Sequence, residues 1–307
     1  MPALLRAPTR EYCTISVDSH RWDGYRPRAN DIVIATYPKT GTTWMQRIVD
    51  LLVFQSTAPR RFMETSPWLD TRFSPNDAQL SKLEAQTHRR FIKSHLPFDS
   101  LPVYAGVKYI HVARDGRDVC WSFHNHQLGF KRELAAGRMA DKDMPPQPPA
   151  DPRDFFLSWM QQAEDVASTA LPFFDFENTY WRERKLPNLL FVHYADLKAD
   201  LAGEMRRVSD FLGIDTPGRL MRDLVRTAQF ETMKAQGEDL MPELREAFDR
   251  GAERFLHQGT NGRWKDALTK EDLARYDALV RRKFSPAQAR WMAHGRRIAG
   301  DPARMGD

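Results

Sequence analysis

The sequence predicts an α/β fold built on a parallel β-sheet. Short apolar runs rich in β-branched residues, which suit strands buried on both faces, alternate with stretches in which apolar residues recur at helical spacing. The 307 residues also suffice for one large α/β domain. We therefore expect a single domain over residues 1–307, with three α/β/α layers and a central parallel sheet of about four to five strands.

The strands and helices can be assigned to particular segments. Strands are expected at Ile32–Thr36, Phe91–Lys93, Tyr109–Val112 and Leu189–His193. Helices are expected at Trp44–Phe54, Phe155–Ala170 and Met205–Leu212. The proline-rich segment Met144–Asp154 is expected to be a surface loop, because proline cannot continue a helix. A ligand should bind at the edge of the sheet where the carboxyl ends of the parallel strands meet.

The composition, 41% hydrophobic and 28% charged residues, is typical of a folded, soluble protein. The two cysteines, Cys13 and Cys120, are too few for a disulfide framework or a cysteine-rich metal site, and they suit a reducing compartment. No apolar run approaches the ~18–20 residues of a membrane span, and the N-terminal residues lack the form of a signal peptide. We therefore expect a cytoplasmic protein that does not act at a membrane.

The formal net charge of +5, from 46 basic and 41 acidic residues, indicates a weak preference for anions. Much of the excess lies in Arg281–Arg297, which contains six basic residues and no acidic one. The simplest interpretation of this segment is a solvated helix face. Nothing in the chain resembles a nucleic-acid-binding module, so nucleic acid is not expected as a partner.

A turn suited to an anion follows the first predicted strand. The segment Tyr37–Trp44 contains a lysine, three threonines and a glycine, and it leads directly into a helix. Backbone N–H groups and the helix dipole point into such a turn, and Gly41 would let the backbone approach an anion closely. It is not a Walker A sequence, since Lys39 precedes the glycine. The alternative is an ordinary turn with Thr42 or Thr43 as the helix N-cap.

The ends of the second and third predicted strands carry further candidates. Lys93 and His95 lie two residues apart on an extended segment and project to the same side, where a histidine can act as a general base near neutral pH. Arg114 ends the third strand, and arginine binds phosphate through forked hydrogen bonds. Ser122 lies about two turns into the following helix. The alternatives are that His95 is a structural histidine and that the residues after Arg114 form a charged turn. Two anion sites beside one crevice nevertheless predict a ligand with phosphates at both ends.

The segment Phe255–Lys265 contains two glycines and several hydrogen-bond donors, and it is expected to be a loop. The sequence leaves two interpretations open. The segment either closes over a ligand or is a polar surface loop anchored by Trp264.

Five segments together resemble motifs of the cytosolic sulfotransferases that use PAPS (3′-phosphoadenosine 5′-phosphosulfate), with bacterial members as the better match. They are TYPKTGTTW (Thr36–Trp44), FIKSHLP (Phe91–Pro97), VARDGRDVCWSF (Val112–Phe123), LLFVHYADLK (Leu189–Lys198) and GTNGRWK (Gly259–Lys265). They occur in the family's order over about three quarters of the chain. The resemblance implies a P-loop-like fold and transfer of a sulfuryl group from PAPS to a phenol, alcohol or amine, with PAP as product and no metal.

The resemblance also implies a role for each matching residue. Those implied at the 5′-phosphosulfate are Lys39, Thr40, Gly41, Thr42 and Thr43, with Trp44 near the adenine. Those implied at the 3′-phosphate and the rest of the adenosine are Arg114, Ser122, Tyr194, Phe230, His257, Gln258 and Gly259. His95 would take the proton of the acceptor during an in-line displacement at sulfur, while Lys39 and Lys93 stabilise the leaving oxygen. Ser122 would also contact Lys39 before the acceptor binds.

The chain departs from the family pattern at the donor site. His257 and Gln258 stand where relatives commonly carry Arg-Lys, so Arg254 or Arg263 would have to supply the missing charge at the 3′-phosphate. The residues before Phe230 also differ, and only Phe230 itself carries over to the adenine contact.

The acceptor pocket and the oligomeric state are less clearly marked. Loops at 56–80 and 129–151 are expected to gate the acceptor pocket. Their aromatic residues, Phe62, Trp68, Phe73 and Phe130, favour a phenol or another apolar alcohol. In the family's C-terminal dimerisation segment Lys265 and Thr269 match, whereas Lys270 and Ala274 do not. This pattern predicts a monomer, or a dimer formed through another surface.

Two alternative functions stay open at this point. One is a protein that binds PAPS or PAP with little activity, and the other is a P-loop-like small-molecule kinase. A kinase would need a Walker A lysine and Mg²⁺ ligands. The presence of both Lys39 and His95 favours the sulfotransferase.

Overall fold

The structure, a computed structural model, describes residues 1–133, 147–164 and 172–306. At its centre lies a parallel sheet of four strands in the order β3-β2-β5-β6. The strands are β2 (Ile32–Ala35), β3 (Phe91–Ser94), β5 (Lys108–Ala113) and β6 (Leu189–His193). The α/β class is confirmed, and each predicted strand is present with ends within one residue of those expected.

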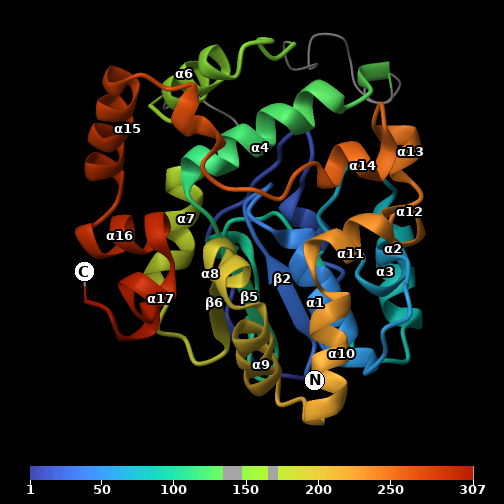
Figure 1. The fold of residues 1–307 in the computed structure, drawn as a ribbon. Coiled ribbons are helices and arrows are strands. Elements are labelled where there is room, and N and C mark those ends of the chain that lie inside the picture. Colours follow the sequence, from blue (N-terminus) through green and yellow to red (C-terminus); the bar gives the residue numbers. More distant parts are fainter. Residues whose placement is uncertain (134–146, 165–171, 307) are drawn as a thin grey trace.

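Helices connect the strands and cover both faces of the sheet (Figure 1). In chain order they are α1 (Thr42–Phe54), α2 (Phe62–Thr65), α3 (Asn76–Ala85), α4 (Gly116–Gly129), α6 (Pro152–Gln162), α7 (Phe173–Arg182), α8 (Tyr194–Ala199), α9 (Leu201–Leu212), α10 (Gly218–Thr227), α11 (Phe230–Ala235), α12 (Gly237–Leu240), α13 (Leu244–Ala247), α14 (Gly251–Leu256), α15 (Lys270–Lys283), α16 (Pro286–His294) and α17 (Arg296–Ala299). A short antiparallel pair, β1 (Leu4–Arg6) with β4 (Val103–Tyr104), was not predicted from the sequence.

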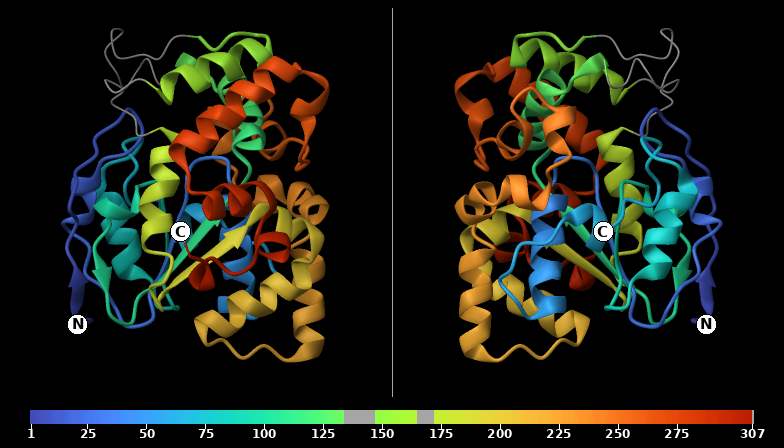
Figure 2. Two further views of the ribbon diagram at one scale, coloured as in Figure 1. Left: turned by 90° about the vertical axis from the view of Figure 1, so that its left-hand side faces the viewer. Right: turned by 90° about the vertical axis from the view of Figure 1, so that its right-hand side faces the viewer.

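The sheet buries alternate residues of each strand in two separate cores. On β2, Ile32 and Ile34 pack with residues of α1, α9 and α10, whereas Val33 and Ala35 pack with residues of α4, α6 and α7. Successive side chains of a strand point to opposite faces, so a strand between two helical layers is apolar throughout. Figure 2 shows α9 and α10 on one side of the sheet and the N-terminal segment on the other. The predicted three-layer architecture is confirmed.

The start of α1 differs from the expectation. Gly41 is the N-cap, and no side chain caps the helix. Thr42 and Thr43, each considered as an N-cap, instead lie in the first turn. The N–H groups of this turn therefore have no capping side chain, which leaves them available to an external anion.

The predicted loop Met144–Asp154 is wrong at its end, where α6 begins at Pro152. Asp151 caps this helix through a hydrogen bond from a backbone N–H, and proline suits the first turn because it needs no N–H partner there. Residues 144–146 lie outside the described residues, as does the part of the predicted helix Phe155–Ala170 beyond 164.

The basic segment Arg281–Arg297 spans the end of α15, all of α16 and the start of α17, so its basic residues lie on three helices and not on one helix face. Much of its charge is paired, in the contacts Arg282–Glu164, Lys283–Asp175, Arg296–Glu204 and Arg297–Asp200. Among the described helices, none combines the length and the hydropathy that a membrane span requires.

Candidate active site

The carboxyl ends of the three strands β3, β2 and β5 lie side by side, because β2 is paired with both of the others. Ala35 is opposite Ser94 on β3, and Ile34 is opposite Ile110 on β5. The segments that leave these strands carry Lys39, His95 and Arg114. The parallel pairing thus brings together three residues that are far apart in the sequence.

The turn before α1 is built for a close approach of the backbone. Lys39 has φ 73° and Gly41 has φ 125°, both in the left-handed region. A Cβ atom on Gly41 would lie 3.0 Å from the Tyr194 ring and 3.3 Å from Val112, so a larger residue would displace its neighbours. The Thr40 hydroxyl donates to the carbonyl of the preceding segment at 2.9 Å, which tightens the turn.

Lys39 points its ammonium group into a partly apolar environment. The Nζ atom lies 3.4 Å from Nδ1 of His126 and 4.2 Å from the centre of the Phe255 ring. Burial, reinforced by the positive charges of Lys93 and Arg114, lowers the pKa of Lys39 to about 7. A lysine in this state gains most from a bound anion, which would restore the charged form.

Lys93 is a second lysine of lowered basicity. Its Nζ atom lies 4.2 Å from the centre of the Trp68 ring. Burial lowers the pKa of Lys93 to about 8, although Asp70 and Glu243 act in the opposite direction. Lys39, Lys93 and Arg114 therefore form a cluster of basic side chains. Buried carboxylates do not balance every positive charge in this cluster.

His95 is fixed in one tautomer by its surroundings. Its Nδ1 atom lies 2.8 Å from the carbonyl oxygen of Thr36, and a carbonyl only accepts, so Nδ1 carries the hydrogen and Nε2 has the free lone pair. The backbone N–H of His95 donates to Asp70 at 3.0 Å, and the ring meets Trp68 edge-on at 5.0 Å. Burial, helped by Lys93, holds the pKa of His95 well below its ordinary value. The imidazole is neutral at pH 7 and can accept a proton on Nε2.

Arg114 connects the strand end to the distant loop 257–265. Its guanidinium donates to the Asn261 side chain at 2.7 Å and to the Thr260 carbonyl at 2.9 Å. It also stacks over the Tyr194 ring, 4.1 Å from the centroid. The Tyr194 hydroxyl in turn donates to the Gly259 carbonyl at 3.2 Å. The loop thus packs against Arg114 and Tyr194 at the strand ends.

The residues expected around the adenosine lie together. Trp44 and Tyr194 meet edge-on with ring centroids 5.3 Å apart. A Cβ atom on Gly259 would lie 2.7 Å from the Phe230 ring, so this glycine is needed for the loop to pass over the aromatic ring. His257 is partly buried, and Gln258 is exposed.

The two candidate replacements for the missing basic pair differ in their surroundings. Arg254 packs against Gly129 and lies 3.6 Å from Asp249. Arg263 forms no ion pair or hydrogen bond with the part of the chain that the structure describes, and burial together with the charge of Arg114 lowers its pKa. Arg263 is therefore a half-buried cation beside Arg114, with the charge of Asp118 nearby but no ion pair to the described residues.

Sequence reasoning missed two residues that shape the site. Asp70 is fully buried and accepts from the His95 backbone and from the indoles of Trp22 and Trp68. His126, which contacts Lys39, lies four residues after Ser122 on the same face of α4. The i+4 spacing was a signal that could have indicated His126, whereas nothing in the sequence indicates Asp70. Ser122 itself is half-buried on α4, one turn away from the Lys39 contact.

The segment 56–80, expected as a gating loop, contains α2 and the start of α3. Phe62 is buried in the core beneath α1 and does not line the site. Trp68, Phe73 and Phe130 instead form a row of rings that begins at His95, with centroid separations of 6.0 Å and 6.5 Å along the row. Much of the second expected gating loop, 129–151, lies outside the described residues.

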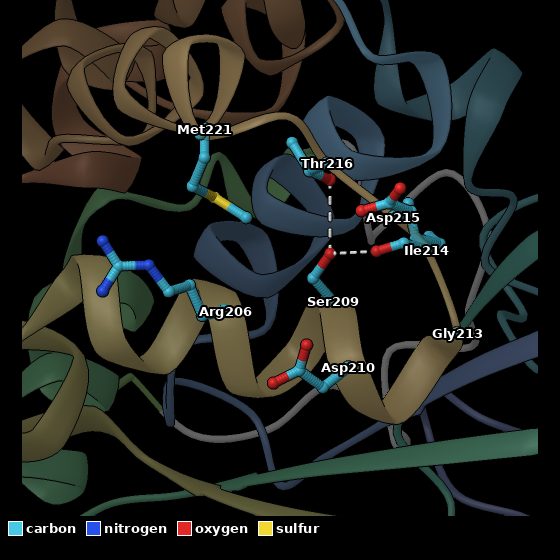
Figure 3. A pocket seen from close by; sticks show the side chains of 9 residues that line it. Arg206, Ser209, Asp210, Gly213, Ile214, Asp215, Thr216 and Met221 are labelled. Carbon is cyan, nitrogen blue, oxygen red and sulfur yellow. Dashed lines mark hydrogen bonds between the residues drawn. The ribbon is translucent and has the colours of Figure 1, made fainter.

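A cavity of about 520 Å³ lies elsewhere, between α9 and α10 (Figure 3). A second hollow shares Asp210 and Gly213 with it and includes Asn30, Arg89 and Lys108, which lie at the amino ends of the strands. Both hollows are thus at the end of the sheet opposite to His95, and neither contains a residue expected in the site.

Comparison with known proteins supports one assignment. A family model described as "Sulfotransferase domain" matches residues 29–288. The chain is 32% identical to the glycolipid sulfotransferase of Mycobacterium bovis, over 95% of this chain and 96% of the relative. It is 28% identical to cytosolic sulfotransferase 1 of Danio rerio, over 92% and 93% of the two chains.

Two solved structures share the fold. Retinol dehydratase in complex with androsterone and inactive cofactor PAP matches with a TM-score of 0.69 at 22% identity, over 87% of this chain and 84% of that one. Mouse sulfotransferase SULT7A1 complexed with PAP matches with a TM-score of 0.68 at 20% identity, over 89% and 92%.

Proposed function

The chain belongs to the sulfotransferase domain family, and on that basis we propose that it transfers the sulfuryl group of PAPS to a hydroxyl group of an apolar acceptor, with His95 as the general base. The observation that carries the proposal is the state of His95. Its Nδ1–H is engaged by the Thr36 carbonyl, its Nε2 is a free acceptor, and two lysines of lowered pKa stand beside it. A neutral base next to a positive anion site is what sulfuryl transfer to a hydroxyl requires.

The residues present fit a donor with phosphate groups at both ends. The uncapped N-terminus of α1 and Lys39 are suited to the phosphosulfate end, and the absence of a Cβ at Gly41 leaves room for it. Arg114 and the half-buried Arg263 are suited to the 3′-phosphate end. The Trp44–Tyr194 pair and Phe230 supply aromatic faces for the adenosine between them. PAP in complexes of two proteins with this fold supports PAPS as the donor.

PAPS, when bound, supplies an activated sulfuryl group on a phosphate leaving group. The acceptor oxygen bonds to sulfur as the bond from sulfur to the phosphate oxygen breaks, and Nε2 of His95 takes the acceptor's proton. Lys39 and Lys93 place positive charge where the leaving oxygen becomes negative. The products are a sulfate ester, PAP and a proton, so no further reactant is needed.

Arg263 is our assignment for the charge that His257 and Gln258 do not provide. Arg254 is turned towards Gly129 and Asp249, whereas Arg263 shares its surroundings with Arg114, Asp118 and Tyr194. Burying a guanidinium that forms no ion pair or hydrogen bond with the described residues costs free energy. A 3′-phosphate would offset that cost.

The row of rings that leads away from His95 supports an apolar acceptor. The mycobacterial relatives are named for glycolipids, and one protein with this fold was solved with androsterone. We therefore place a glycolipid hydroxyl first, then sterol-like alcohols and phenols, with amines last. Relatives named as cytosolic sulfotransferases support a cytoplasmic location.

The test is transfer of ³⁵S from labelled PAPS to a panel of glycolipids, sterols and phenols. We expect product with wild type, and a loss of about 10²–10⁴-fold for His95→Ala, because that is the usual contribution of a general base. His20→Ala, at an exposed histidine, is the matched control. Transfer that survives in His95→Ala would refute the role of His95. PAP binding without transfer to any acceptor would favour the binding protein, and ATP-dependent transfer abolished by EDTA would favour the kinase.

A further inference from the structure

Lys39 and His126 form a contact that no expected role accounts for. The Nζ and Nδ1 atoms are 3.4 Å apart, although the two residues lie 87 positions apart in the chain. The sulfotransferase resemblance implied that Ser122 would contact Lys39 before the acceptor binds. Among the described residues, the side-chain hydrogen-bond partner of Lys39 is His126 instead.

The charged form of Lys39 sets the direction of this hydrogen bond. A protonated lysine has three N–H donors and no acceptor, so in that form Nδ1 of His126 supplies the lone pair. The hydrogen of the neutral ring therefore resides on Nε2. Two buried cationic groups cannot occupy this contact together, and the contact requires His126 to be neutral.

The aromatic surroundings fix the position of the His126 ring. Phe123 lies nearly parallel to it, with an interplanar angle of 9° and centroids 6.2 Å apart. Phe248 and Phe255 meet it at 4.9 Å and 5.7 Å. Phe255 is also the ring over which the Lys39 ammonium lies. The lysine is thus held between one aromatic face and one ring nitrogen, both on the side of the site formed by α4 and α14.

We propose that His126 is a positioning residue, which accepts a hydrogen bond from the Lys39 ammonium group in the donor-free enzyme and releases that group to the bound donor. The first part of the proposal rests on the contact alone. The second part rests on the proposed function. His126 does not touch the reacting atoms in this account; it acts through Lys39.

The charged and titratable groups around the pair support this role. Lys93 and His95, which extend from β3, face His126 together with Lys39, and Lys93 and Arg114 face Lys39. With burial, these neighbours hold the pKa of His126 well below its ordinary value. The ring consequently stays neutral and remains an acceptor throughout the physiological range. A protonated lysine surrounded by cations has few other acceptors.

The test is the pKa of Lys39 in the donor-free enzyme. It is measured by NMR of protein labelled with ¹³C at the lysine ε-carbon, and the Lys39→Arg variant assigns the resonance. Removing the acceptor by His126→Phe should lower the midpoint of the Lys39 titration by roughly one pH unit, because a hydrogen bond from a charged group stabilises that charged form. His126→Gln keeps a neutral acceptor and should restore a midpoint close to that of wild type. His126→Leu is a second acceptor-free variant, should the phenylalanine variant fold poorly.

His124→Phe is the matched control, because His124 lies on the same helix and its Nε2 donates to the carbonyl oxygen of Pro149 at 2.8 Å, not to Lys39. An unchanged Lys39 midpoint in both acceptor-free variants would overturn the proposal, as would an equal shift in His124→Phe or in His126→Gln.

Adding PAP to wild type tests the second part separately. The Lys39 resonance should move as the ammonium exchanges Nδ1 of His126 for a phosphate oxygen. If PAP binds and the resonance stays in place, the exchange is refuted. If PAP does not bind at all, the proposed function fails, while the result from the donor-free enzyme still stands or falls by itself.

Discussion

The affinity for PAP should decrease steeply with pH, because the donor-free enzyme holds Lys39 at a pKa of about 7. A bound phosphate favours the charged ammonium, so the pKa of Lys39 is raised in the complex and binding takes up a proton above pH 7. Below pH 7 the lysine is already charged and the affinity is at its maximum. For a group with this midpoint, the dissociation constant rises about fifty-fold between pH 7 and pH 9.

Isothermal titration calorimetry in buffers of different ionisation enthalpy measures both the affinity and the proton uptake. Lys39→Arg keeps the positive charge at every pH used and should remove this part of the dependence. The smaller dependence that remains belongs to Lys93, whose pKa is about 8. Equal pH profiles for wild type and Lys39→Arg would refute the assignment of the proton to Lys39.

Three further predictions concern single residues. Gly41→Ala should weaken PAP binding more than tenfold and cost about 1–3 kcal/mol of stability, measured by urea unfolding, because φ is 125° there and the new Cβ meets Tyr194 at 3.0 Å. Asp70→Ala should cost about 3–5 kcal/mol in the same assay, since it leaves three buried N–H donors without an acceptor, whereas Asp70→Asn, which keeps one oxygen, should cost less. Arg263→Ala should weaken PAP binding by about 10–100-fold in calorimetry, and Arg254→Ala should change it little; the reverse order would overturn the choice between the two arginines.

The sheet could be predicted from the sequence because its strands are buried on both faces. Segments such as Leu189–His193 are then apolar throughout and stand out from the helices between them. The pair β1–β4 could not be found in this way, since β1 is only three residues long and partly exposed. Two short strands separated by many residues leave no periodic pattern.

The site could be predicted as far as it depends on strand ends. Lys39, His95 and Arg114 each lie two or three residues after a predicted strand, and parallel pairing brings such positions together without further information. The supporting contacts depend on long-range packing instead. Asp70 lies 25 residues before His95, and His126 lies 87 residues after Lys39. No local sequence pattern indicates a contact across either separation.

Packing also distinguishes residues that are equivalent in type. Arg254 and Arg263 are equivalent in charge and close in sequence, and only their neighbours distinguish them. Phe62 and Trp68 were both candidates for the acceptor pocket. The first is buried beneath α1, and the second packs against His95.

The most direct test of the central claim is PAP binding, measured by thermal unfolding of wild type and Lys39→Ala with and without PAP. At about 100 times its dissociation constant, a ligand adds about 2.7 kcal/mol of stability, which raises the melting temperature by several degrees. We expect this rise in wild type and its loss in Lys39→Ala, with the two proteins equally stable in the absence of PAP to within about 1 kcal/mol. If millimolar PAP leaves the melting temperature of wild type unchanged, the strand ends do not form a donor site, and the account of this chain as a PAPS-dependent sulfotransferase is contradicted.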